Sequence, residues 1–267
     1  MCESINLSIL VVTYNCSNYI KRFISELTNS LKNSMNYEIL IWDNNSTDRT
    51  PKSIETFSNV VYTSSEINIG FAKANNILIK KAKYENILLL NPDVFGFTVD
   101  FWNLLFNKWD NKNPLFIKLL NEDGSFQDCI GEVVSVKRFF HHFFISIKYE
   151  LISTPCEVGM GIMAFMLTSM DMINKIGLLS ENYHMYAEDM DWCYRAKKCG
   201  YKVMYDPTLS LTHIGGASAK SIWSKNNQLK AKYKSESIFI KTHYHGFYKI
   251  LMLIINKIKR FLCRIKR

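Results

Sequence analysis

The strongest constraint on the fold is an alternation of apolar runs and helix-spaced segments in the first third of the chain. Apolar runs rich in strand-forming residues occupy positions 7–13, 38–42, 60–63 and 86–90. Between them, helices are predicted after Ser17 and over residues 47–57 and 71–83, the first from the spacing of Ile20, Phe23, Ile24, Leu27 and Leu31. Strands that alternate with helices form parallel sheets with right-handed crossovers. The sequence therefore predicts an α/β fold with a mostly parallel central sheet flanked by helices.

A polar cluster directly follows three of these strands. The clusters are Thr13-Tyr14-Asn15, Asp43-Asn44-Asn45 and Asn91-Pro92-Asp93. Ligands of open parallel sheets bind beyond the carboxyl ends of the strands. One cluster alone would mean little, but three of them predict a single binding site assembled from three loops.

The rest of the chain is less regular. Helices are predicted over residues 101–109, 170–176 and 188–198, strands over 159–167, 202–205 and 209–213, and a turn over 121–127. The aromatic and basic segment 138–147 fits no element. No internal repeat or low-complexity linker is present, so we expect one catalytic domain of residues 1–220 and a C-terminal helical segment of residues 221–267.

Three places carry side chains suited to catalysis. Asp93 ends a buried strand behind a proline, where it either forms a turn or offers a carboxylate to a hard divalent cation. Residues 188–191 hold three carboxylates at a helix start, which either cap the helix or supply a general base. His213 precedes a Gly-Gly-Ala-Ser run and is either a structural histidine or a ligand of a metal or phosphate.

Together these pieces resemble the family 2 glycosyltransferases with a GT-A fold, in particular their rhamnosyltransferase-like branch. Six segments match in the family's order: residues 8–15 (SILVVTYN), 42–48 (WDNNSTD), 68–76 (NIGFAKANN), 89–93 (LLNPD), 188–192 (EDMDW) and 213–218 (HIGGAS). Each is weak alone, but six in order are specific. The resemblance implies a Rossmann-like nucleotide-diphospho-sugar transferase fold and a hexosyltransferase activity.

The resemblance also implies roles for individual residues. The nucleotide-sugar site would comprise Thr13, Tyr14, Asn15, Asp43, Asn45, Asn68, Gly70, Asn75, Asn91 and Asp93. Asp93 would carry a divalent cation, Mg²⁺ or Mn²⁺, with His213 as a further metal or phosphate ligand. Asp189 would be the catalytic base with Glu188 beside it. Asp191 and Trp192 would position the acceptor.

Asn91 departs from the family pattern, because many members carry an acid at this first position of the DxD motif. An Asn-Pro-Asp version occurs in the rhamnosyltransferase-like branch. It places fewer charges on the metal, so cation binding is expected to depend on the substrate diphosphate. The implied reaction is an inverting transfer from a dTDP- or UDP-linked sugar, with rhamnose as the branch-level expectation. The acceptor would be a hydroxyl of a glycan or undecaprenyl-linked glycan in bacterial surface polysaccharide synthesis.

The charge of the chain is concentrated at its C-terminus. The formal net charge is +9, from 33 Lys and Arg against 24 Asp and Glu. Residues 241–267 hold eight basic residues and no acid, so removing them leaves 25 basic against 24 acidic residues. On a helix, most of these basic residues oppose an apolar face of Phe247, Ile250, Leu251, Ile254, Ile258, Phe261, Leu262 and Ile265. Such a helix either lies on an anionic membrane surface or docks on the catalytic domain.

Two other functions compete with the glycosyltransferase. A nucleotidyltransferase would normally show a Gly-rich basic loop after the first strand, but residues 13–17 (TYNCS) contain neither Gly nor Lys. A nucleic-acid-binding protein would interleave basic and aromatic residues across the domain, a pattern approached only at 138–148. We therefore expect no nucleic-acid partner.

The compartment follows from cysteines and targeting signals. The seven cysteines form no CxxC pair, which favours reduced thiols in a cytosolic protein. The N-terminus lacks the features of a signal peptide, and no apolar run reaches the length of a membrane span. We expect a cytoplasmic enzyme bound peripherally at the cytoplasmic face of the inner membrane.

Overall fold

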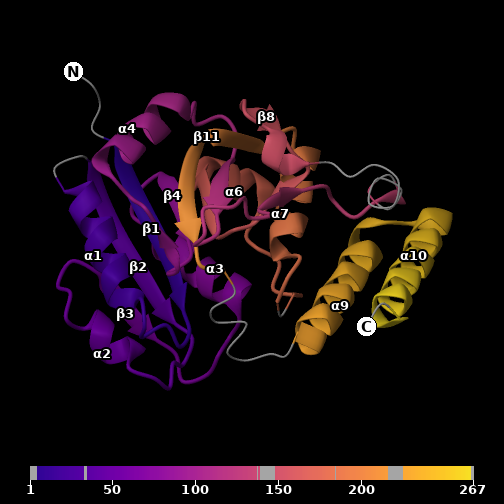
Figure 1. The fold of residues 1–267 in the computed structure, drawn as a ribbon, viewed down its shortest axis with the longest axis horizontal. Helices are drawn as coiled ribbons and strands as arrows, with labels where there is room; N and C mark the ends of the chain where they lie inside the picture. The colour runs from indigo at the N-terminus through magenta and orange to yellow at the C-terminus, as the bar shows by residue number, and fades with distance from the viewer. Residues whose placement is uncertain are drawn as a thin grey trace.

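The computed structural model describes residues 5–32, 35–136, 138, 148–183, 185–215 and 225–265. In these ranges, helices flank a mixed nine-stranded sheet, and a pair of C-terminal helices lies at one side of it (Figure 1). The strand order is β3-β2-β1-β4-β10-β6-β11-β5, with β8 paired to β11. The predicted segments 139–147 and 216–218 lie outside the described residues, as does the expected domain boundary near residue 220.

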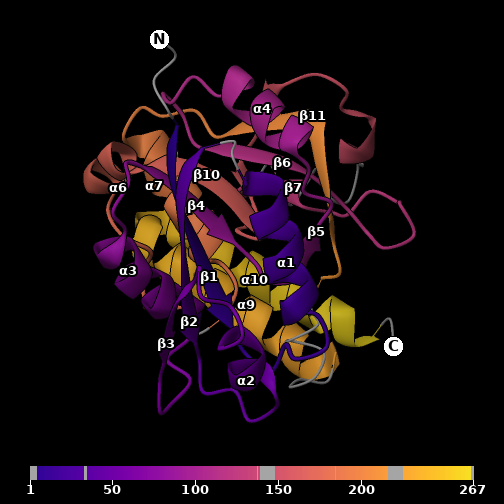
Figure 2. The same cartoon turned by 90° about the vertical axis from the view of Figure 1, so that its left-hand side faces the viewer.

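The N-terminal half is the predicted parallel unit. Its elements are β1 (Asn6–Thr13), α1 (Ile20–Leu31), β2 (Asn36–Asp43), α2 (Thr50–Ile54), β3 (Val61–Ser64), α3 (Phe71–Lys81) and β4 (Asn86–Leu90). β1 pairs in parallel with both β2 and β4. The chain moves outward from β1 to β3 and then returns to β4, so α1 and α3 cover opposite faces (Figure 2). This reversal makes the carboxyl ends of the neighbouring strands β1 and β4 a topological switch point. Sheets of this class bind ligands at such a point.

The second half adds mainly antiparallel neighbours. Its elements are β5 (Val94–Phe95), α4 (Val99–Lys108), β6 (Leu115–Leu120), β7 (Ile130–Gly131), the 3₁₀ turn η1 (Tyr149–Leu151), β8 (Cys156–Glu157), β9 (Met160–Gly161), β10 (Phe165–Ser169), α6 (Met170–Ile176), α7 (Glu188–Lys198) and β11 (Met204–His213). β10 runs antiparallel to β4 and β6, whereas β6 and β11 are parallel. β7 and β9 form a separate two-stranded sheet.

Three of the predicted helices and strands have different bounds in the structure. The helix predicted over 47–57 begins only at Thr50, because Asp48 accepts a hydrogen bond from the Thr50 N–H and another from the Ser17 N–H. The strand predicted over 159–167 is broken between β9 and β10, where Ile162 N–H donates to the Cys129 carbonyl. The two strands predicted over 202–213 are one strand with an irregular register between Asp206 and Ser210.

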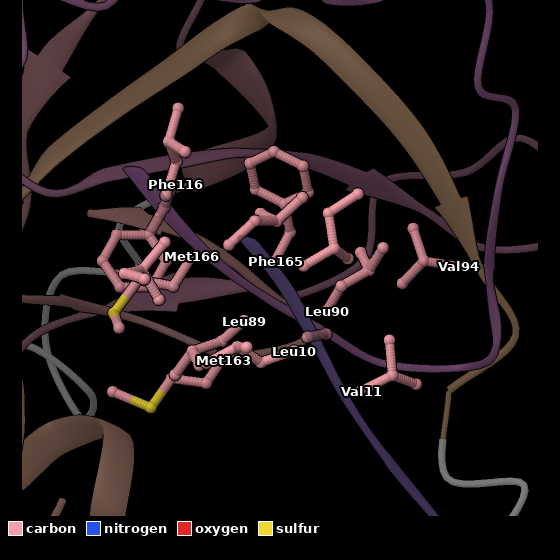
Figure 3. Packing of buried hydrophobic residues seen from close by; sticks show 14 of the residues in the cluster. Leu10, Val11, Leu89, Leu90, Val94, Phe116, Met163, Phe165 and Met166 are labelled. Carbon is pink, nitrogen blue, oxygen red and sulfur yellow. The ribbon is translucent and has the colours of Figure 1, made fainter. Parts of the chain in front are cut away.

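The core lies on both faces of β1, β4 and β10. Leu10, Val11, Leu89, Leu90, Val94, Phe116, Met163, Phe165 and Met166 form part of this cluster (Figure 3). One close approach depends on glycine, since a Cβ at Gly161 would lie inside the van der Waals radius of the buried Phe116 ring. The five cysteines that the structure describes are free thiols, and Cys16, Cys129 and Cys193 are buried.

The C-terminal segment is two helices rather than the single helix considered from the sequence. α9 (Lys225–His243) and α10 (Gly246–Ile265) are joined by a tight turn and pack side by side (Figure 1). A second hydrophobic cluster joins them to the catalytic domain through Val134, Tyr183, Ala187, Met190, Phe239, Ile240, Met252 and Ile255. Among the described residues, no helix has a stretch both long enough and apolar enough to cross a membrane.

Candidate active site

The first two predicted loops are joined by hydrogen bonds at the ends of β1 and β2. Thr13 Oγ1 donates to Asp43 Oδ1 at 2.8 Å, and Asp43 Oδ2 accepts from the Ser46 N–H at 2.8 Å. Asn15 reaches the same loop, because its Oδ1 accepts from the Thr47 N–H at 2.8 Å. Asp43 is buried, whereas Asn45 is exposed. The structure thus brings Thr13, Asn15 and Asp43 together, with Tyr14 half-buried between the first two.

The matching segment 68–76 lies beside these two loops. Asn44 Oδ1 accepts from the Ile69 N–H, and Asn44 Nδ2 donates to the Gly70 carbonyl, both at 3.3 Å. Gly70 precedes α3 with φ +85°, which glycine adopts without strain. Asn68 is exposed and its Oδ1 accepts from the Gly70 N–H. Asn75 is buried in α3, and its Oδ1 has no hydrogen-bond partner among the described residues.

Asp93 and His213 meet because β5 pairs with the end of β11. Val94 is the register partner of His213, and the Ile214 N–H donates to the Asp93 carbonyl at 3.0 Å. This register brings Asp93 Oδ1 to 3.2 Å from His213 Nε2, with each side chain only 7% exposed. Asn91 Nδ2 lies 3.5 Å from the same nitrogen. The predicted metal pair is therefore a buried contact between the loop before β5 and the end of β11, which lie far apart in the sequence.

Gln127 sets the orientation of the His213 ring. Its Nε2 donates to Asn121 Oδ1 and to the His213 carbonyl, both at 3.1 Å, so its Oε1 is the acceptor that faces His213 Nδ1 at 2.6 Å. The Nδ1 atom therefore carries a proton, and in the neutral ring the Nε2 lone pair points toward Asp93.

This geometry fits a divalent cation. An unprotonated imidazole nitrogen and a carboxylate oxygen both present lone pairs, which a cation bound by both atoms would satisfy. The described residues contain no group of three or more His, Cys, Asp or Glu side chains arranged to hold a metal ion. Asp93 and His213 would therefore supply part of a coordination shell that a diphosphate and water complete.

The acidic cluster of α7 begins at a strained turn. Tyr186 and Ala187 both have positive φ, +68° and +72°, which is uncommon for residues other than glycine. Burial raises the pKa of both Glu188 and Asp189, and the charge of Asp189 raises that of Glu188 further. Lys232 and Arg138 lower the pKa of Asp189. Asp189 is therefore the carboxylate of the pair that ionises first.

Glu188 and Asp189 line a cavity of about 230 Å³. Its other lining residues are Asp128, Ile130, Gly131, Arg138, Met160, Ile162, Tyr186, Ala187, Met190, Lys232 and Glu236. Asp128 directly follows Gln127, the residue that contacts His213, so the cavity and the Asp93–His213 pair are linked through residues 127 and 128.

Asp191 and Trp192 do not reach this cavity, so their expected acceptor role is not supported by their placement. Asp191 is buried and bonded to three side chains: Tyr183 and Arg195 donate to it, and His243 Nε2 lies 2.6 Å from its Oδ1. Trp192 is fully buried and donates to the Gly177 carbonyl. Both residues anchor α7, because their buried side chains contact neighbouring parts of the fold.

Sequence reasoning missed several residues of the site. Gln127 lies in a segment identified only as a turn, and its partner His213 is 86 positions away. Ser46 was part of a matching motif but had no assigned role, although it holds Asp43. Lys232 and Glu236 belong to the segment interpreted as an appendage. No local pattern marks Gln127, Lys232 or Glu236, since each acquires its role from a distant partner, whereas Ser46 lies three positions from Asp43.

Comparison with known proteins identifies the family. The profile described as "Glycosyl transferase family 2" matches residues 8–163, more than half of the chain. The chain belongs to glycosyltransferase family 2. This membership makes the protein a glycosyltransferase, as the resemblance implied, and it replaces the nucleotidyltransferase and nucleic-acid-binding alternatives.

Curated relatives of this family 2 glycosyltransferase include rhamnosyltransferases. The N-acetylglucosaminyl-diphospho-decaprenol L-rhamnosyltransferase of Mycobacterium tuberculosis is 24% identical and aligns over 91% of this chain and 86% of its own length. Rhamnosyltransferase WbbL of Escherichia coli is 26% identical over 81% of this chain and 86% of its own length. The resemblance to the rhamnosyltransferase-like branch is therefore confirmed.

Solved structures confirm the GT-A fold. TarS of S. aureus (residues 1–349) superposes with a TM-score of 0.57 and 17% identity, covering 94% of this chain and 70% of that protein. The mannosyltransferase PcManGT of Pyrobaculum calidifontis, solved with GDP-Man and Mn²⁺, gives a TM-score of 0.59 at 12% identity, covering 94% and 72%. At these identities the likeness concerns the fold alone.

Proposed function

We propose that this enzyme is an inverting glycosyltransferase that moves L-rhamnose from a dTDP- or UDP-linked donor to a hydroxyl of an undecaprenyl-linked glycan in bacterial surface polysaccharide synthesis. The observation that carries the proposal is the position of Asp189, an ionisable carboxylate in a cavity linked to the buried Asp93–His213 pair through residues 127 and 128. Relatives named as rhamnosyltransferases, one of them acting on a diphospho-decaprenol sugar, support the donor and acceptor classes.

The donor would bind along the switch point of the sheet. Thr13, Tyr14, Asn15, Asp43 and Asn45 would hold the base and ribose, and Asn68, Gly70, Asn75 and Asn91 would line the sugar-diphosphate path. Asp93 and His213 would hold a divalent cation, Mg²⁺ or Mn²⁺. When bound, that ion would neutralise charge on the departing nucleoside diphosphate.

Asp189 would act on the acceptor. As the acceptor oxygen forms its bond to the anomeric carbon, the bond from that carbon to the diphosphate oxygen breaks and the hydroxyl proton passes to Asp189. A single displacement of this kind inverts the anomeric configuration. Glu188, whose pKa is raised more than that of Asp189, would stay protonated near neutrality and leave one ionised base in the pair.

The membrane association would reside in α10. Its side chains Met252 and Ile255 pack inward, whereas Phe247, Ile250, Ile254, Ile258 and Phe261 are 44–79% exposed along one stripe. Lys257 and Arg260 are exposed beside this stripe. An apolar stripe flanked by basic residues suits the surface of an anionic membrane. α10 would thus hold the enzyme peripherally at the cytoplasmic face of the inner membrane, where a lipid-linked acceptor resides.

A donor panel tests the activity. Purified enzyme is incubated with Mg²⁺ or Mn²⁺, extracted undecaprenyl-linked glycans and one nucleotide sugar at a time. We expect the glycolipid to gain mass only with a dTDP- or UDP-linked donor, and dTDP-rhamnose to give the highest rate. If the enzyme transfers a different sugar efficiently but not rhamnose, the rhamnosyl assignment is wrong.

A further inference from the structure

The cavity that holds Asp189 has one wall built by the C-terminal segment. Lys232 and Glu236 of α9 line the same cavity as Glu188 and Asp189. They are four residues apart and so project from the same side of α9. This wall lies outside residues 8–163, the part of the chain that the family profile matches.

α9 is held firmly in this position. Phe239 and Ile240 are fully buried in the cluster that includes Ala187 and Met190, which flank the catalytic pair. Ser235 Oγ donates to the Met185 carbonyl at 2.8 Å, in the turn that leads into α7. At the far end of the helix, His243 contacts Asp191. These contacts fix the α9 wall against α7 independently of the membrane stripe on α10.

Glu236 carries an unsatisfied carboxylate oxygen, as Glu188 of the same cavity does. It is only 6% exposed, and its Oε2 is shielded from solvent without a hydrogen-bond partner among the described residues. A shielded carboxylate oxygen without a donor costs free energy, because it has lost hydration without compensation. A ligand hydroxyl in the cavity would supply the missing donor.

The charge and size of the cavity indicate which ligand fits. Apart from Glu188, which the proposed mechanism keeps protonated, its lining has three acids, Asp128, Asp189 and Glu236, against two cations, Arg138 and Lys232. This excess of acids disfavours a phosphate and favours a neutral polyhydroxyl group. The volume of about 230 Å³ lies below the ~300–1,000 Å³ of sites for drug-sized ligands and suits one sugar unit.

We infer that α9 completes the acceptor site and that Glu236 binds a hydroxyl of the neutral acceptor sugar, next to the hydroxyl that Asp189 deprotonates. This inference rests on the proposed function for the identity of the acceptor. It makes the C-terminal segment part of the substrate site. The acceptor's diphosphate and lipid would then extend out of the cavity, toward the outer surface of the α9–α10 pair.

The variant Glu236→Gln tests this role, since it keeps the size of the side chain and removes its charge. With extracted undecaprenyl-linked glycan as acceptor, we expect KM for the acceptor to rise about 10- to 100-fold, as for loss of a hydrogen bond to a charged group. Glu55→Gln, at an exposed position beyond α2, is the matched control.

Binding measured without turnover separates this inference from the proposed function. Saturation-transfer NMR with methyl N-acetylglucosaminide should detect contact with the wild-type enzyme and lose it in Glu236→Gln. That result would support the site even if no donor were transferred, in which case only the proposed function fails. An unchanged acceptor KM in Glu236→Gln, together with equal sugar binding by the variant and the wild type, would overturn the inference.

Discussion

At the scale of single residues, the candidate site contains two pairs of side chains with different electrostatic properties. Asp93 Oδ1 and His213 Nε2 face each other in a buried contact at 3.2 Å, a geometry that a shared cation would stabilise. Glu188 and Asp189 are adjacent carboxyls whose pKa values are both raised, and positive charge nearby favours ionisation of Asp189. We propose that the first pair binds a cation and that the second moves a proton.

Replacing the proposed base Asp189 with Asn keeps the shape of the side chain and removes its ability to accept a proton. We expect Asp189→Asn to lower kcat by about 10²- to 10⁴-fold, the usual contribution of a general base. Nucleoside diphosphate affinity should change by less than twofold, because Asp189 lies in the acceptor cavity. Calorimetric titration with the nucleotide, alongside the transfer assay, checks both. Full activity in the purified variant would remove Asp189 from the mechanism.

The pH profile should report the same carboxylate. The pKa of Asp189 is raised from its usual range to about 6, so kcat should fall as the pH drops through that value and the base becomes protonated. Stability should move in the opposite direction. The folded protein holds this proton to a higher pH than the unfolded chain does, so the free energy of unfolding declines as the pH rises from about 4 to about 6. Rate measurements and chemical denaturation across pH 4–8 check both trends, and Asp189→Asn should remove this contribution to each.

Gln127 should control cation affinity without touching substrate. Gln127→Leu removes the acceptor that keeps the proton on His213 Nδ1, so the ring is free to turn or change tautomer. We expect Mn²⁺ affinity in the presence of nucleoside diphosphate to fall about 10- to 100-fold. Titration followed by electron paramagnetic resonance measures it directly. Wild-type activity should stop in EDTA and return with Mg²⁺ or Mn²⁺, and persistence of transfer in EDTA would contradict the metal role of Asp93.

At the scale of elements, the site depends on where strands and helices end. The short strand β5 pairs with the last residues of β11, and this pairing brings Asp93 to His213. α7 presents Glu188 and Asp189 from its first turn, while the buried Asp191 and Trp192 just after them anchor the helix. Acids in a first turn are also favoured by the helix dipole, so the segment that we propose to supply the base also stabilises the helix.

The β7–β9 pair should tolerate no side chain at Gly161. A methyl group there would overlap the Phe116 ring, which is buried in the core and has little room to move. We expect Gly161→Ala to lower the free energy of unfolding by about 1–3 kcal/mol, measured by chemical denaturation. Gly131→Ala is the matched control, because Gly131 is a strand glycine of the same pair with open space at its Cβ position. Equal stability of the two variants would contradict the packing argument.

At the scale of the whole molecule, the C-terminal helices extend from the cavity of Glu188 and Asp189 to an exposed apolar stripe. α9 packs on the catalytic domain and lines the cavity of Glu188 and Asp189, while α10 packs on α9 and exposes an apolar stripe. The two sequence-based alternatives for this segment, docking and membrane binding, thus fall on different faces. The inner face of the helix pair docks on the catalytic domain, and we propose that the outer apolar stripe of α10 binds a membrane.

Vesicle binding tests the outer stripe. We expect Ile250→Ser combined with Ile254→Ser to lower binding to phosphatidylglycerol-containing liposomes at least tenfold in flotation, with slow donor hydrolysis retained. Binding of the wild type should weaken with salt, since attraction to anionic lipid is screened. Leu104→Ser is the matched control, an exposed leucine on α4. Equal flotation of the double variant and the wild type would refute the membrane role. Point substitutions suit this test better than truncation, because α10 also covers part of α9.

The sequence by itself determined the parallel strands β1 to β4, the three polar loop clusters, the acidic start of α7 and the family, but it did not predict β5, β6, β7 or β8. These properties follow from local patterns, because burial imposes periodicity along a strand or helix and loop chemistry follows directly after a strand. It could not assign Gln127, Lys232 or Glu236, and it gave Asp191 and Trp192 a role that their burial does not support. Only the tertiary structure decided which side chains share a cavity. That outcome depends on strand register and helix docking between residues as many as about a hundred positions apart, and no local pattern encodes it.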